Sequence, residues 1–243
     1  EKDLIKAIEK TKVARKPKQH LATFGSTIIN YYVVTEPIYS EIAPGKQETV
    51  VRTGKVNSGK PEIVTPTYAL NLKGFSDEAY KYLEFISSKF GMNSPGVLYQ
   101  YKNEPGNTNI LSGSVKEVSG NIIKELDDKK DKLTAVIVGV DELWDVSLLK
   151  FIHDFTSESL ISNVNEFNSR GLLKPQVNFG GVPKAAIHRI DILFEQVESG
   201  ADPEILKKEL DRWGLFEHYE ERFLGLFNKW TNLSCQIIIK LII

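Results

Sequence analysis

The chain has 243 residues, of which 41% are hydrophobic and 26% charged, the composition of an ordinary globular protein. Its 31 Lys and Arg residues nearly balance its 32 Asp and Glu residues, so a net charge of −1 provides no overall field to attract nucleic acid or an anionic membrane. The single cysteine, Cys235, excludes an intramolecular disulfide and zinc sites built from several thiolates, and it indicates a reducing compartment, taken here as the cytoplasm. No apolar run approaches the roughly 18 residues of a membrane span.

Local patterns in the first third of the chain predict one helix and several strands. Apolar residues at helical spacing predict a helix over residues 3–15, followed by a basic link that ends at His20. From Thr27, a run of β-branched and aromatic residues predicts a strand that Pro37 ends. Residues 48–66 predict a β-hairpin, because a turn containing glycine separates two β-prone runs.

The next segment mixes weak strand signals with two helices. Residues 68–72 and 97–101 are strand-like, and a polar Pro-Gly region at 103–109 predicts a turn. A helix begins near Ser76. A second helix begins at Ser114, because a Ser followed by a Glu three residues later is a capping box.

Residues 134–140, with the sequence TAVIVGV, form the strongest predicted strand, and its continuous apolar character indicates burial on both faces. Beyond it, strand signals largely vanish. Proline and glycine at helix ends, together with the apolar periodicity, predict helices over 143–155, 157–167, 183–199, 203–213 and 215–230.

These elements predict an α+β fold, with a small mixed or antiparallel sheet and packed helices in the N-terminal part and an all-helical C-terminal part. We divide the chain into an N-terminal helix with a basic link (1–20), an α+β region (21–140), a helical region (141–230) and a tail (231–243). The apolar tail is compatible with a terminal strand, a partner-binding segment or a non-native extension.

Three acidic residues follow the strongest predicted strand: Asp141, Glu142 and Asp145. Carboxylates at the carboxyl end of a buried strand often hold Mg²⁺ or act as catalytic acids. These residues are therefore candidate catalytic residues for a Mg²⁺-dependent phosphoryl-transfer or nuclease-like enzyme. The competing interpretation is that they cap and stabilise the start of the following helix.

Basic residues form a second candidate site. Positive charge in the N-terminal segment and the predicted hairpin, with aromatic residues nearby, is typical of a nucleic-acid surface. The near-zero net charge favours the alternative, in which these residues lie on a solvated surface and their charges protect an edge hairpin against aggregation. The candidate residues are Lys12, Arg15, Lys16, Lys18, Arg52, Lys55 and Lys60.

Aromatic residues at helical spacing near the C-terminus form the third candidate. They are typical of a core stripe, and equally of an interface with a protein partner or a second copy. Because the sequence holds neither a complete catalytic motif nor a metal-ligand cluster, we expect a non-catalytic interaction or regulatory protein that uses this helix as its contact surface. The predicted interface residues are Trp213, Phe216, Tyr219, Phe223, Phe227 and Trp230.

Overall fold

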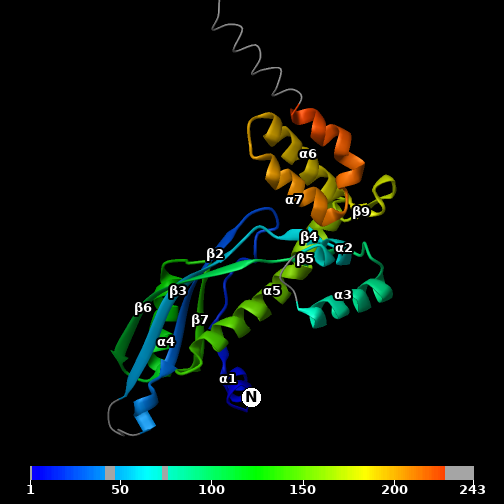
Figure 1. The fold of residues 1–243 in the computed structure, drawn as a ribbon. Helices are drawn as coiled ribbons and strands as arrows, with labels where there is room; N and C mark the ends of the chain where they lie inside the picture. The colour runs from blue at the N-terminus through cyan, green and yellow to red at the C-terminus, as the bar shows by residue number, and fades with distance from the viewer. Residues whose placement is uncertain (1, 42–46, 73–75, 228–243) are drawn as a thin grey trace, which may run out of the picture. The chain divides into compact units, whose positions relative to one another are not determined.

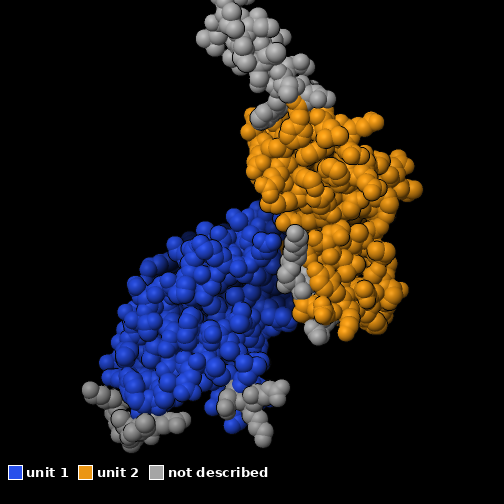
Figure 2. All heavy atoms as spheres, in the orientation of Figure 1, with its two compact units in different colours: residues 1–62, 99–166 blue, residues 63–98, 167–243 orange. Residues whose placement is uncertain are grey.

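The computed structural model describes residues 2–41, 47–72 and 76–227. Its fold is mixed α+β with helices toward the C-terminus, which confirms the predicted fold class. Two compact units form: unit 1 comprises residues 1–62 and 99–166, and unit 2 comprises residues 63–98 and 167–243 (Figure 2). Each unit therefore takes segments from both sides of the boundary that the sequence suggests near residue 140.

Unit 1 is built on a five-stranded mixed sheet (Figure 1). Strand β3 runs antiparallel to both of its neighbours, β2 and the edge strand β6. Strand β7 runs parallel to β2 and pairs antiparallel with β1 on its other side. The strands, in their order across the sheet, are β1 (Lys12–Arg15), β7 (Thr134–Val140), β2 (Thr27–Glu36), β3 (Glu48–Ser58) and β6 (Tyr101–Ser112).

Helices cover both faces of this sheet. Helix α4 (Val115–Asp128) packs Val118 and Leu126 against Val34 and Val136. Helix α5 (Trp144–Ser169) packs against the opposite face, because the residues that it contacts, such as Ile137, alternate along the strands with those that contact α4. The short helices α1 (Lys2–Lys10) and η1 (Ile38–Glu41) complete unit 1.

The start of α5 lies very close to the end of β7. Gly139 makes this approach possible, because a Cβ at this position would lie 2.7 Å from the Cβ of Ser147 and still closer to its Oγ. The hydroxyl of Ser147 is in turn hydrogen-bonded to the hydroxyl of Thr11, just after α1 (2.8 Å). Glycine is therefore required at the carboxyl end of this strand for a steric reason.

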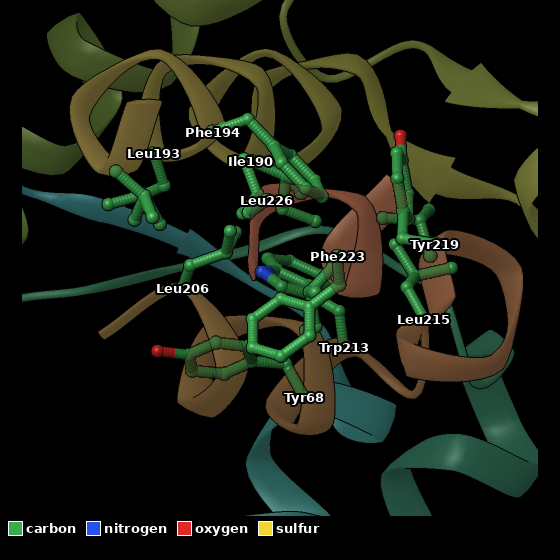
Figure 3. Close-up of a cluster of buried hydrophobic side chains, with 14 residues drawn as sticks. Tyr68, Ile190, Leu193, Phe194, Leu206, Trp213, Leu215, Tyr219, Phe223 and Leu226 are labelled. Carbon is green, nitrogen blue, oxygen red and sulfur yellow. The ribbon is translucent and has the colours of Figure 1, made fainter. Parts of the chain in front are cut away.

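Unit 2 is mainly helical, and two small two-stranded pairings accompany its helices. Residues from α2, α6, α7 and the helical residues 216–227 share one hydrophobic core (Figure 3). The elements are β4 (Glu62–Val64, beginning at the unit boundary), α2 (Pro66–Leu70), α3 (Asp77–Phe90), β5 (Gly96–Leu98), β8 (Pro175–Gln176), η2 (Val177–Phe179), β9 (Val182–Pro183), α6 (Lys184–Glu198) and α7 (Pro203–Trp213).

The predicted helix boundaries with strong capping signals are confirmed. Ser114 caps α4, accepting a hydrogen bond from the backbone N–H of Glu117 (3.2 Å). Asp202 caps α7 in the same way, with Pro203 as the first helical residue. Gly214 ends α7 with φ +67°, a left-handed conformation that favours glycine.

Four local predictions in the N-terminal half are wrong, because tertiary pairing overrides local propensity. Residues 12–15 leave the predicted helix and form β1 on β7. The predicted hairpin does not form: β3 pairs with β2 and β6, whereas β4 pairs with β5. The predicted strand at 68–72 falls largely in helix α2, and the predicted turn at 103–109 lies within strand β6. In the C-terminal half, the two helices expected over 143–167 are the single helix α5.

Replacing Gly139 with Ala should destabilise unit 1, because the added methyl group overlaps Ser147. We expect the free energy of unfolding to fall by about 1–3 kcal/mol, the usual cost of overpacking. Urea unfolding measures this change. The matched control is Gly120→Ala in α4, because nothing lies within 4 Å of a Cβ added there. This variant should raise the free energy of unfolding by up to about 1 kcal/mol, because Ala favours helices. Equal stabilities of the two variants would contradict the close approach of α5 to β7.

Candidate functional site

The carboxyl ends of β2 and β7 bring together the polar residues Thr35, Arg52 and Asp141. The two strands are parallel, so they end at the same edge of the sheet, and Asp141 directly follows β7. Arg52 reaches this edge from β3, where it lies opposite Val33 of β2. In open sheets, this kind of edge is where ligands commonly bind.

The carboxylate of Asp141 is engaged within the protein. Arg52 Nη1 donates a hydrogen bond to Asp141 Oδ1 (2.6 Å), and the Thr35 hydroxyl donates to the same oxygen (2.8 Å). The side chains of Arg52 and Asp141 are only 19% and 11% exposed, and the guanidinium carbon lies 5.7 Å from the centre of the Trp144 ring. This is a partly buried, hydrogen-bonded ion pair.

The other two predicted catalytic acids are exposed. Asp145 lies in the first turn of α5, where Asp145 Oδ1 accepts a hydrogen bond from the backbone N–H of Val146 (2.9 Å). Its negative charge is favourable at the positive end of a helix. Glu142 lies in the turn between β7 and α5. The structure therefore gives Asp141 an ion-pair role and Asp145 a position at the helix start.

Four of the seven predicted nucleic-acid residues are paired with carboxylates. Arg52 binds Asp141, and Lys16 pairs with Glu158. Lys18 and Arg15 share Asp127, at 2.9 Å and 3.1 Å from its Oδ1.

Arg15 is buried, and its guanidinium also donates to the backbone carbonyls of Thr134 and Asp131. Of the remaining candidates, Lys12, Lys55 and Lys60 are exposed, and Lys55 lies opposite Glu104 in the β3–β6 ladder. Among the described residues, this arrangement places carboxylates beside most of the predicted basic surface.

The predicted aromatic interface lies largely in the core of unit 2. Trp213, Tyr219 and Phe223 are buried against α2, α6 and α7 (Figure 3), and the Trp213 indole donates to Glu209 Oε1 (3.0 Å). Phe216 is half-buried and Phe227 is exposed. Trp230 and the tail lie outside the described residues. These buried aromatic residues therefore form part of the core of unit 2.

The exposed apolar surface that the sequence reasoning missed lies on α3. On this helix and its following turn, four large apolar side chains are 53–62% exposed: Tyr82, Phe85, Phe90 and Met92. We call this set the α3 face. From the sequence, the helix that begins near Ser76 is predicted only as an element of the fold, although residues two apart on a helix face different sides, which places Phe85 away from the partly buried Leu83.

Hydrogen bonds anchor α3 and its following turn within unit 2. The Tyr80 hydroxyl donates to the backbone carbonyl of Leu72 (2.9 Å), and the hydroxyl and backbone N–H of Thr67 both donate to the carbonyl of Met92. Gly91, with φ +95°, ends the helix. These contacts hold α3 and its following turn in place, while the side chains of the α3 face stay exposed.

No protein-family model, curated protein or solved structure matches this chain. Within residues 2–41, 47–72 and 76–227, no three His, Cys, Asp or Glu side chains are placed to share a metal ion. Over the same ranges, no helix combines the length and the apolar character needed to cross a membrane.

Replacing Asp141 with Asn should lower the free energy of unfolding by about 2–3 kcal/mol, because the partly buried Arg52 loses its carboxylate partner. The loss should be the same in EDTA and in Mg²⁺, as measured by urea unfolding. Glu142→Gln and Asp145→Asn are the controls, and each should change stability by less than about 0.5 kcal/mol. A Mg²⁺-dependent stabilisation that Asp141→Asn abolishes would instead support a metal site.

The Asp127 carboxylate should make the protein sensitive to acid. Hydrogen bonds from Lys18 and Arg15 lower the pKa of Asp127 below its ordinary value of 3.8. The folded state therefore binds this proton more weakly than the unfolded state, and the stabilisation is present above pH 3.8 and lost as the pH falls through the lowered pKa.

Asp127→Asn should lower the urea midpoint at pH 7, and its difference from the unsubstituted chain should shrink in acid, because protonation removes the same charge. The neighbouring Asp128→Asn is the control and should change little at either pH. A difference for Asp127→Asn that stays constant down to acid pH would contradict this role.

Proposed function

We propose that this chain is a non-catalytic interaction protein, and that the α3 face is its contact surface. The observation that carries the proposal is that Tyr82, Phe85, Phe90 and Met92, each more than half exposed, all lie on α3 and its following turn. Clustered exposed apolar side chains mark interaction sites, and aromatic residues are frequent anchors at interfaces. We therefore keep the interaction role predicted from the sequence and assign it to α3, because the C-terminal aromatic residues largely fill a core.

The charges around the α3 face indicate the chemistry of the partner. The ammonium of Lys89 lies 5.9 Å from the centre of the Phe85 ring and 5.3 Å from that of Phe90. Lys81 is exposed one residue before Tyr82. These cations favour a protein partner whose apolar groove is bordered by Asp or Glu side chains.

Two further observations support a binding role in preference to catalysis. Asp141, the strongest catalytic candidate, already has Arg52 as its partner, so a metal ion would have to displace a guanidinium. The single cysteine supports placing this role in a reducing compartment such as the cytoplasm.

Replacing Tyr82 and Phe85 together with Ser should weaken partner binding strongly without unfolding the chain. Loss of two interface anchors should weaken binding by about 2 kcal/mol or more, which is about 30-fold in Kd. The partner is first isolated on the tagged full chain from cell extract, and its Kd is then measured by calorimetry. The midpoint temperature of thermal unfolding should change little, because both side chains are exposed.

The matched control is Ile161→Ser on α5, which removes an equally exposed apolar side chain from another helix. It should bind the partner with unchanged affinity. The proposal is wrong if the double variant and the control bind equally well, or if the tagged chain retains no protein that the double variant fails to retain.

A further inference from the structure

Among the residues that the structure describes, strand β6 is one edge of the five-stranded sheet and pairs with β3 alone (Figure 1). It is twelve residues long, and nearly all of its side chains are exposed. The outward backbone N–H and C=O groups of an edge strand are a template for a further strand. Proteins usually protect such an edge with charges, prolines or bulges.

The first half of β6 carries this protection. Lys102 and Glu104 form an exposed ion pair (2.9 Å), and Pro105 removes one backbone donor. A bulge follows, because Gly106 and Asn107 together oppose the single residue Thr53 in β3. The Thr53 hydroxyl accepts a hydrogen bond from the Asn107 N–H (3.1 Å), which holds the bulge in place.

The second half, Thr108–Ser112, is regular and unprotected. It pairs residue by residue with β3 and contains neither a charge nor a proline. Ile110 is 57% exposed, and Leu111 is exposed on the opposite face. The other edge of the sheet differs, because β1 has only four residues and carries the cations Lys12 and Arg15.

We propose that Thr108–Ser112 is a dimerisation edge, on which a second copy of this chain adds its own β6 in antiparallel orientation. A twofold axis through the middle of the segment places Ile110 opposite Ile110 of the other copy. Thr108 then lies opposite Ser112, and Asn109 lies opposite Leu111. The two five-stranded sheets become one continuous sheet.

The composition of the segment favours a second copy as the occupant. A twofold contact places the same residues on both sides, so a charged segment would face its own charge, whereas this one is uncharged. The paired β-branched side chains of Ile110 add cross-strand contact. Gly113 and the bulge at Gly106 lie on either side of the pairing, which keeps Pro105 out of the ladder.

A cysteine at the twofold position tests this pairing directly. Directly opposite residues in antiparallel strands lie about 4.5–5.5 Å apart at Cα, which is within the range that a disulfide spans. Ile110→Cys, made in a Cys235→Ser background, should therefore form a disulfide-linked dimer under mild oxidation. Ile28→Cys is the control in the same background, because Ile28 is similarly exposed but lies on the interior strand β2.

Sedimentation gives an independent readout. The unsubstituted chain should form a dimer whose population rises with concentration. Ile110→Lys should sediment as a monomer, because two ammonium groups would face each other across the twofold axis. Circular dichroism should show that this variant is folded. The Tyr82→Ser, Phe85→Ser variant should still dimerise, which separates this inference from the role of the α3 face. An unsubstituted chain that stays monomeric, or Ile110→Cys that cross-links no faster than Ile28→Cys, would overturn it.

Discussion

Burial of β7 on both faces is the constraint on which the rest of unit 1 depends. Val136 contacts the α4 side of the sheet and Ile137 contacts the α5 side, and both are fully buried. Because β7 runs parallel to β2, the chain must cross over between β6 and β7, and α4 provides this connection. Helix α5 then covers the other face, and its close approach requires glycine at position 139.

The same constraint explains why Asp141 is paired within the protein. A strand buried on both faces delivers Asp141 into a place with little access to water, and an unpaired carboxylate there would be costly. Arg52 and Thr35 supply the compensating donors. We propose that other molecules bind instead at the α3 face and along the second half of β6, where apolar side chains are exposed.

The sequence predicted the elements whose signals are local. The apolar run of β7 and the Ser114 cap of α4 needed only neighbouring residues to be recognised. Strands β1 and β6 were not predicted, because their pairing with β7 and β3 outweighs a helical pattern in one case and a Pro-Gly sequence in the other. The candidate site also shows that local signals are predictable and distant contacts are not. The sequence identifies Asp141 as a candidate, but its partner Arg52 is distant in sequence and is predicted to lie on a different surface.

We propose that Arg52 and Asp141 act as a structural pair, and that the chain acts through its exposed apolar surfaces. A double-mutant cycle of Arg52→Met and Asp141→Asn, read by urea unfolding without added metal, tests this claim most directly. We predict that the double variant is more stable than the sum of the single losses implies, by about 1–3 kcal/mol, because the two side chains share one interaction. Strictly additive losses, within about 0.3 kcal/mol, would contradict it.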